Sequence, residues 1–110
     1  MRTWMRCYWD DEDVWFYFEV DAEGVVIRQV ELQGPELTPI AAASLEEWQR
    51  AHDASRVGAY EARFGATAEP PVGEWEGHDP VYLTSAEFEA VWESARRRLT
   101  GPGRVASCPG

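Results

Sequence analysis

The sequence has no long hydrophobic run and no glycine-rich stretch. Its apolar segments are far shorter than the roughly 20 residues of a membrane-spanning helix, and residues 1–13 lack the apolar segment of a secretory signal. The nine glycines stand apart from one another, so no phosphate-binding loop is expected. These absences predict a single cytoplasmic domain of 110 residues without a membrane anchor.

Cysteine and histidine are scarce, with two of each. Cys7 lies in a predicted strand beside an acidic run that disfavours a thiolate, so we expect a buried, inert thiol. The second cysteine, Cys108, lies near the end of the sequence. We expect both thiols to be free and no disulfide between them, which fits a reducing cytoplasm. His52 and His78 each precede an aspartate, but the metal-dependent phosphohydrolases with such pairs need further histidines. We therefore expect no metal and no cofactor.

Lysine is absent, and all ten basic residues are arginine, a bias that we attribute to a GC-rich genome. Against them stand twenty acids, for a net charge of −10. Four arginines follow the last acid, Glu93, so residues 1–95 carry twenty acids and six arginines, a net charge of −14. Such a surface repels nucleic acid and anionic membranes and attracts cationic partners. The alternative is that the charge serves solubility alone.

The first part of the chain alternates in the manner of β-strands. We expect strands at residues 2–9, 14–20 and 25–32, with a short edge strand at 38–42. Gly24 can take a positive φ in the turn between the second and third strands. Pro39 has no N–H to donate, so the fourth strand fits only an edge. The pattern predicts an antiparallel β-meander of three to four strands.

The second predicted strand has two different faces, because alternate side chains point to opposite sides. One face is wholly apolar and consists of Val14, Phe16, Phe18 and Val20. We expect this face to meet the helices. The other face carries Trp15, Tyr17 and Glu19. An exposed aromatic patch of this kind marks a binding surface, unless the long loop at 66–83, with Trp75 in its middle, covers it.

Two capping boxes mark the starts of helices. Ser44 and Thr84 are each followed three residues later by glutamate, so that hydroxyl and carboxylate can bond to each other's backbone N–H groups. The first helix should run from Ser44 toward Ser55, followed by an apolar stripe of Val57, Tyr60 and Phe64 that Gly65 closes. The second has a stripe of Phe88, Val91, Trp92, Ala95 and Leu99 and should stop at Gly101-Pro102. The sequence thus predicts one α+β domain at 1–100, with both helices on one face of the meander and a flexible tail at 101–110.

The densest negative charge lies at residues 10–13, between two aromatic runs. A calcium loop needs oxygen ligands at alternate positions and a glycine at the sixth. Counted from Asp10, the fifth and sixth positions are Val14 and Trp15, so the pattern fails. We interpret the run as an exposed hairpin tip. Twenty acids supply too many carboxylate pairs to single one out, and we expect no catalysis.

The order of elements is similar to that of a family of short, uncharacterised bacterial proteins common in actinobacteria. The resemblance rests on the Trp-rich opening strand, Trp4 to Trp9, on residues 17–32 and on the closing helix at 83–99. It implies a scaffold and no catalytic residues. Families of this profile resemble the immunity proteins of bacterial toxin systems, which are small, acidic cytosolic domains.

This resemblance implies a binding protein in which charge steers a basic partner protein and aromatic side chains hold it. The predicted partner-binding residues are Trp9, Asp10, Asp11, Glu12, Asp13, Trp15, Tyr17 and Trp75. No nucleic acid and no membrane is expected as a partner. Two alternatives stay open: a small-molecule pocket between the aromatic sheet face and the 66–83 loop, and a homodimer that pairs through an exposed sheet face or edge.

Overall fold

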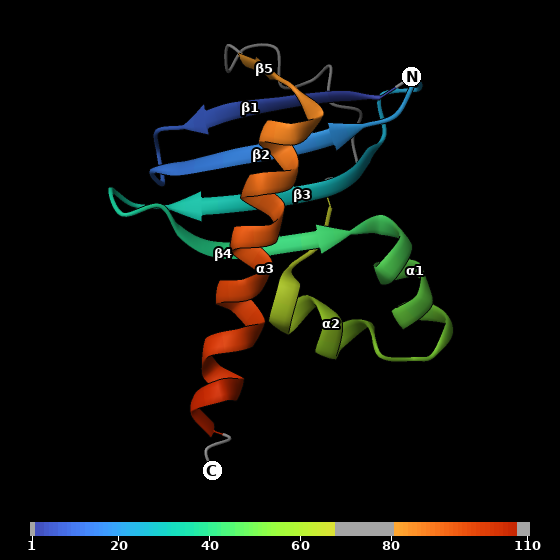
Figure 1. Cartoon of the computed structure of the whole chain (residues 1–110). Coiled ribbons are helices and arrows are strands. Elements are labelled where there is room, and N and C mark those ends of the chain that lie inside the picture. Colours follow the sequence, from blue (N-terminus) through green and yellow to red (C-terminus); the bar gives the residue numbers. More distant parts are fainter. Residues whose placement is uncertain (1, 68–80, 108–110) are drawn as a thin grey trace.

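The computed structural model describes residues 2–67 and 81–107, with the side chains of the last segment described up to Thr100. Five strands form one antiparallel sheet in the order β4-β3-β2-β1-β5 (Figure 1). The strands are β1 (Thr3–Trp9), β2 (Val14–Val20), β3 (Val26–Gln33), β4 (Thr38–Ser44) and β5 (Val81–Leu83). The α+β class and the meander of the first four strands are confirmed. The fifth strand was missed because three residues are too few to show an alternating pattern.

In the described ranges, three helices accompany the sheet: α1 (Leu45–Asp53), α2 (Val57–Phe64) and α3 (Ser85–Ser107). The prediction of two helices is wrong, because the chain turns between α1 and α2, where Ser55 has a φ of 60°. The expected end of the last helix at Gly101-Pro102 is also wrong, since α3 continues to Ser107. A proline removes one backbone hydrogen bond from a helix and can kink it without ending it.

Both predicted N-caps form, but only one is a complete capping box. At α3, the Glu87 N–H donates to Thr84 Oγ1 at 3.1 Å and the Thr84 N–H donates to Glu87 Oε1 at 2.8 Å. At α1, the Glu47 N–H donates to Ser44 Oγ at 3.3 Å, but the Glu47 carboxylate turns toward Arg96 instead. Because the Glu47 carboxylate does not bond back to the Ser44 N–H, it can bond to Arg96 on α3.

Helix α3 crosses one face of the sheet (Figure 1). The core on this face contains the buried residues Tyr17, Val30, Leu32, Ala42, Phe88 and Ala95, with Trp4, Trp15, Leu83, Val91, Trp92 and Leu99 packed around them. The predicted orientation of β2 is therefore wrong, because Trp15 and Tyr17 face α3. On this face the buried Glu19 is paired with Arg28 and Arg2, so its carboxylate does not stay uncompensated beneath α3.

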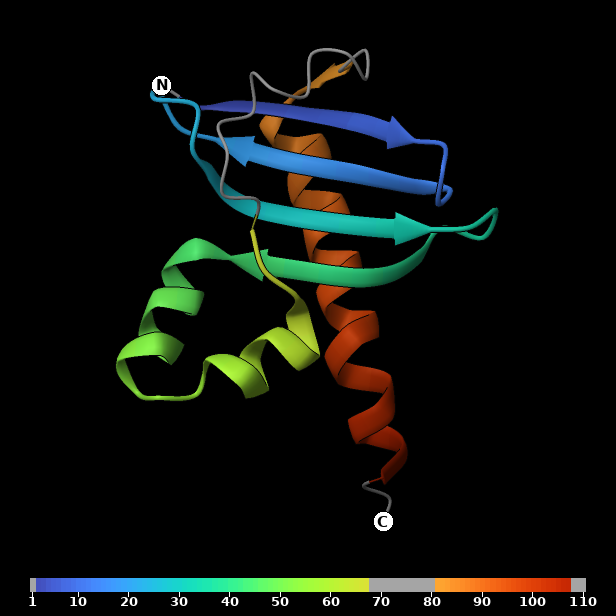
Figure 2. The same ribbon diagram turned by 180° about the vertical axis from the view of Figure 1, so that it is seen from behind.

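The opposite face of the sheet holds a second apolar cluster, made of Met5, Cys7, Phe18, Val20 and Val26, with Phe16 beside it. After α2 the chain crosses β4 on this side (Figure 2). Gly65 permits this crossing, because it has a φ of +83° and a Cβ there would lie 2.9 Å from the Ala41 Cβ. Both faces of β2 are thus buried, which explains why its apolar pattern alone did not fix the orientation.

Candidate functional site

The acidic run forms the tip of the β1–β2 hairpin, as predicted. Asp10, Asp11 and Glu12 are exposed, and Asp13 is half-buried with a φ of 55°. The Asp13 N–H donates to the Asp10 carbonyl at 3.4 Å, which closes the turn. Like charges crowd together here, so their side chains point into solvent. The tip therefore presents three free carboxylates on a fixed backbone.

Tyr8 anchors the tip to the sheet, a role that sequence reasoning missed. Its hydroxyl donates to Asp13 Oδ1 at 2.6 Å, and its ring centroid lies 4.9 Å from that of Trp15. The hydrogen bond to Asp13 raises the pKa of Tyr8, and the charge of Asp10 adds to the effect. A tyrosine two residues before an acidic run was the signal available, although residue spacing alone does not reveal the bond.

The β3–β4 turn lies directly beside this tip. The Gly34 N–H donates to the Asp13 carbonyl at 2.9 Å, and the Gln33 side-chain amide donates to the Glu12 carbonyl at 3.3 Å. The turn presents Glu36 and Leu37, both exposed, and Leu37 has 43% of its surface accessible. We call Asp10, Asp11, Glu12, Glu36 and Leu37 the hairpin-tip surface.

A shallow groove of about 310 Å³ adjoins the hairpin-tip surface. It runs between the β3–β4 turn and α3, and its apolar lining includes Leu32, Leu37, Pro39 and Val91. Arg98 lines it on the α3 side and Glu36 on the side of the turn. Charged residues beside an apolar floor are the usual composition of a protein-binding surface.

The predicted aromatic anchors do not all lie at this surface. Tyr17 is only 7% exposed and packs beneath α3, so it cannot serve as an exposed anchor. Trp15 is half-buried on the same face, with the Arg6 guanidinium 4.8 Å from its ring centroid. Trp9 is half-buried at the end of β1. Trp75 lies outside the described residues. Helix α3 covers this aromatic face within the described residues, and most of the 66–83 loop lies outside them, so the alternative of a small-molecule pocket stays a prediction.

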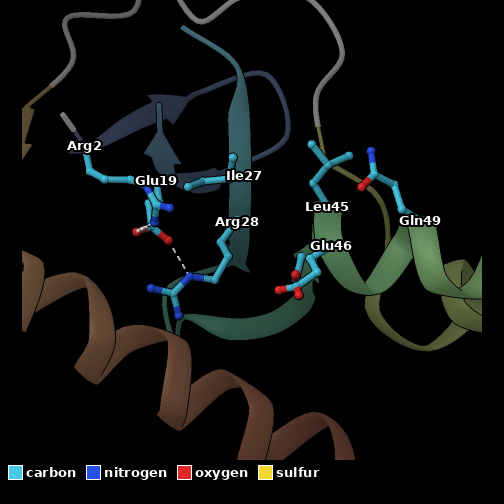
Figure 3. Close-up of a pocket in the computed structure, with 8 residues that line it drawn as sticks. Arg2, Glu19, Ile27, Arg28, Leu45, Glu46 and Gln49 are labelled. Carbon is cyan, nitrogen blue, oxygen red and sulfur yellow. Dashed lines mark hydrogen bonds and ion pairs between the residues drawn. The ribbon is translucent and has the colours of Figure 1, made fainter. Parts of the chain in front are cut away.

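Arg28 links the sheet to the first turns of α3. Its Nε donates to Glu19 Oε1 at 2.5 Å, and its Nη atoms bond to both carboxylate oxygens of Glu89. Arg2 Nη1 donates to the second Glu19 oxygen at 3.0 Å. Arg2, Glu19 and Arg28 form one wall of a pocket of about 310 Å³ beside α1 (Figure 3). Because Glu19 is already bonded to two arginines, we interpret this wall as structural.

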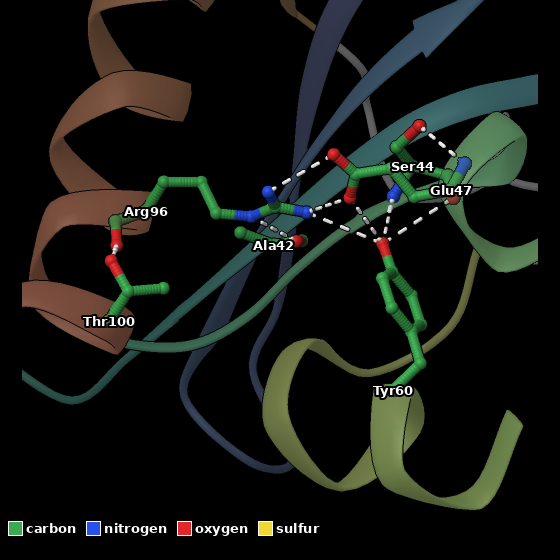
Figure 4. A network of polar contacts seen from close by, with 6 residues as sticks. All are labelled: Ala42, Ser44, Glu47, Tyr60, Arg96 and Thr100. Carbon is green, nitrogen blue, oxygen red and sulfur yellow. Dashed lines mark hydrogen bonds and ion pairs between the residues drawn. The ribbon is translucent and has the colours of Figure 1, made fainter. Parts of the chain in front are cut away.

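Arg96 makes the matching link farther along α3 (Figure 4). Its Nε donates to the Ala42 carbonyl at 2.9 Å, and its Nη2 donates to Glu47 Oε1 at 2.5 Å. The Tyr60 hydroxyl also donates to Glu47 Oε1, at 2.8 Å. Burial raises the pKa of Tyr60 to about 12, with the bond to Glu47 adding to the effect. The network ties α1, α2, α3 and β4 together.

The two arginines alternate with aromatic rings. The Arg28 Cζ lies 5.0 Å from the ring centroids of both Phe88 and Trp92. The Arg96 Cζ lies 4.4 Å from the Trp92 centroid and 3.9 Å from that of Phe64. Each guanidinium is therefore close to two rings while its N–H groups reach carboxylates. This arrangement lets charged side chains contribute to a core.

The free energy of unfolding is expected to fall as the pH drops below 4.5. Burial alone would raise the pKa of Glu19 and of Glu47, but hydrogen bonds from Arg28 and Arg96 respectively outweigh it, and both pKa values lie below the ordinary 4.5. A lowered pKa stabilises the fold above pH 4.5, and this contribution is lost as the pH falls through the folded value.

The pKa of Glu31 shifts in the opposite direction, because burial raises it above 4.5. Its contribution is present at low pH and is lost as the pH rises through the folded value. Urea midpoints should therefore be higher at pH 5.5 than at pH 7, and lowest at pH 3.5. The variant Glu31→Gln should lose part of the rise between pH 7 and 5.5. A midpoint at pH 3.5 equal to that at pH 7 would contradict the assignment.

Two chemical features of the described part of the chain bear on the sequence predictions. No group of three or more histidine, cysteine or acidic side chains is placed there to hold a metal ion. Cys7 is 1% exposed, and burial raises the pKa of its thiol, so the predicted buried thiol is confirmed. Among residues 2–67 and 81–107, no helix is long and apolar enough to cross a membrane.

Comparisons with known proteins give no information on the function of this chain. No protein-family model matches the chain, and neither the curated proteins nor the solved structures give a match. The resemblance to short actinobacterial proteins therefore stays a prediction.

Proposed function

We propose that this chain is a non-catalytic, cytoplasmic binding protein of the immunity or inhibitor type, which neutralises a basic toxin or enzyme. The observation that carries the proposal is the hairpin-tip surface, where four exposed acids lie beside the exposed Leu37 and an apolar groove. Enzymes that act on nucleic acid hold phosphates with basic surfaces. An acidic inhibitor can be steered onto such a surface.

The two components of the surface have different tasks in this proposal. Carboxylates at the tip remain hydrated, so they act at a distance and set the rate of encounter. Leu37 and the groove lose water on contact and set the lifetime of the complex. The groove replaces the predicted aromatic anchors Trp15 and Tyr17, which lie beneath α3.

The partner is first captured with the tagged chain from a lysate of the source organism, washed at low and then high salt. A basic protein retained at low salt and weakened at high salt supports the proposal. If no protein is retained at either salt, the proposal loses its support. A captured protein is then purified for kinetic measurements, because capture alone does not show which surface binds.

The tip variant carries Asp10→Asn, Asp11→Asn and Glu12→Gln. We expect it to associate about tenfold more slowly at low salt, with a much smaller effect at high salt. The control variant carries Glu46→Gln, Asp53→Asn and Glu93→Gln. This control also removes three negative charges, but from exposed sites outside the tip. Equal slowing in both variants would contradict a role for the tip.

Leu37→Asn tests the apolar component, and asparagine tolerates the φ of 54° at this position. We expect dissociation to become about tenfold faster, with association unchanged. Surface plasmon resonance against the purified partner separates the two rates. A homodimer through the same surface would appear instead as a concentration-dependent mass near twice 12.5 kDa.

A further inference from the structure

We propose that the cleft between α1 and α2 binds a small polyanion, a molecule carrying several phosphate or carboxylate groups. The cleft has a volume of about 370 Å³, within the range of small-molecule sites. Three arginines line it, Arg50, Arg56 and Arg63, together with alanines and the rings of Tyr60 and Phe64. Helices α1 and α2 lie at the opposite end of the sheet from the β1–β2 and β3–β4 turns (Figure 1), so the cleft is independent of the function proposed above.

The cleft is positively charged, although the chain as a whole is negative. The whole sequence has twice as many acids as arginines, yet every charged residue that lines the cleft is an arginine. Residues 44–67 contain four acids and three arginines, so this segment is close to neutral. A local positive site can therefore persist within an acidic protein.

Two of the four acids in this segment, Glu47 and Glu61, are engaged elsewhere, and Asp53 is exposed beside His52. Glu47 is bonded to Arg96 and Tyr60. The Glu61 carboxylate accepts from the Trp48 indole N–H at 2.7 Å, and that pair lies beside a different pocket. Only Glu46 forms an ion pair with a cleft arginine, 3.5 Å from Arg50 Nη1, and both side chains remain exposed.

The cleft arginines keep most of their donors free. Within the described residues, neither Arg56 nor Arg63 forms an ion pair, and Arg50 uses one Nη for Glu46. A guanidinium presents five N–H donors in a planar fork that matches the oxygens of phosphate or carboxylate. Three such forks around one concavity suit a ligand with two or more anionic groups.

Backbone hydrogen bonds between the helices fix the positions from which the arginines extend. The Arg56 N–H donates to the Ala51 carbonyl at 2.7 Å, and the Ala54 N–H donates to the Arg50 carbonyl at 3.1 Å. Ser55 takes the left-handed conformation that reverses the chain. On the inner side, the Tyr60 hydroxyl is fixed by Glu47 and by the Ser44 N–H (Figure 4). The walls therefore exist before a ligand arrives, which lowers the cost of binding.

The test is an NMR titration of the ¹⁵N-labelled full chain at low salt, with inorganic pyrophosphate in one series and citrate in another. We expect saturable shifts confined to the backbone amides of residues 50–64. Saturation by pyrophosphate alone identifies phosphate as the ligand group, and saturation by citrate alone identifies carboxylate. Saturation by both shows a general polyanion site. All three results support the proposal.

The variant Arg56→Gln with Arg63→Gln should weaken binding by about tenfold or more. The control, Arg97→Gln, removes a positive charge from an exposed site on α3 that lines neither the cleft nor the groove, and it should leave the affinity within about twofold. Circular dichroism checks that both variants are folded. The proposal is overturned if neither anion gives saturable shifts, if the shifts spread over the whole chain, or if the control weakens binding equally.

Discussion

Replacing Phe88 with alanine is expected to destabilise the domain by about 3–5 kcal/mol. Phe88 is completely buried, stacks on Trp92 with a centroid distance of 6.5 Å, and belongs to the core between α3 and the sheet. Truncation would leave a cavity in the one apolar layer that joins them. Domains of this size have a total stability of about 5–15 kcal/mol, so much of it would be lost.

Urea unfolding followed by tryptophan fluorescence measures this loss. The matched control is Tyr82→Ala, which removes an aromatic ring from β5 that is 68% exposed. We expect the control to stay within about 0.5 kcal/mol of the unaltered chain. A loss below about 1 kcal/mol for Phe88→Ala would mean that α3 does not pack against Tyr17 as described.

Replacing Arg96 with methionine is expected to cost about 2–3 kcal/mol. Methionine keeps much of the apolar stem, but it leaves the Glu47 carboxylate without its guanidinium and the Ala42 carbonyl without its donor. Both side chains of the pair are partly exposed, at 20% and 33%, so solvent lowers the cost from that of a fully buried pair.

Arg96→Lys should recover less than half of this loss. Lysine restores the charge, but its ammonium cannot lie flat between Trp92 and Phe64 while donating to two oxygens of Glu47. The double variant Arg96→Met with Glu47→Gln should lose less than the sum of the single variants, because the unpaired charge is gone. Arg97→Met, at an exposed neighbouring position, is the control. Additive single effects in urea unfolding would contradict the coupling.

The local features of the fold were predictable from the sequence, and the orientation of the sheet was not. Strands β1 to β4, both N-caps and the stripe of α3 depend on neighbouring residues, which set turns, caps and periodicity. The orientation of β2 depends on which face meets α3. Val14 and Trp15 point to opposite sides, and both sides are apolar enough to be buried. Ion pairs between distant residues, Arg28 with Glu19 and Glu89, mark the face that α3 covers.

The candidate sites also divide into features that depend on neighbouring residues and features that depend on distant ones. The acidic tip is continuous in sequence and was predicted. The groove beside it depends on the sheet register, which brings Gln33 opposite Val14 and so places Leu37 near the tip. The arginine cleft could not be predicted, because Arg50, Arg56 and Arg63 do not repeat along a single helix. They meet only because the chain reverses at Ser55.

The order of the meander and α3 along the chain has a consequence for synthesis on the ribosome. The meander is complete at Ser44, but its aromatic face is covered only when the chain has been made as far as Leu99, 55 residues later. At about 5–20 residues per second, this takes roughly 3–11 seconds. During that time Tyr17 and Trp15 lack the helix that buries them. The exposed carboxylates of the acidic tip, already made, add negative charge to the growing chain, and like charge disfavours contact between neighbouring nascent chains.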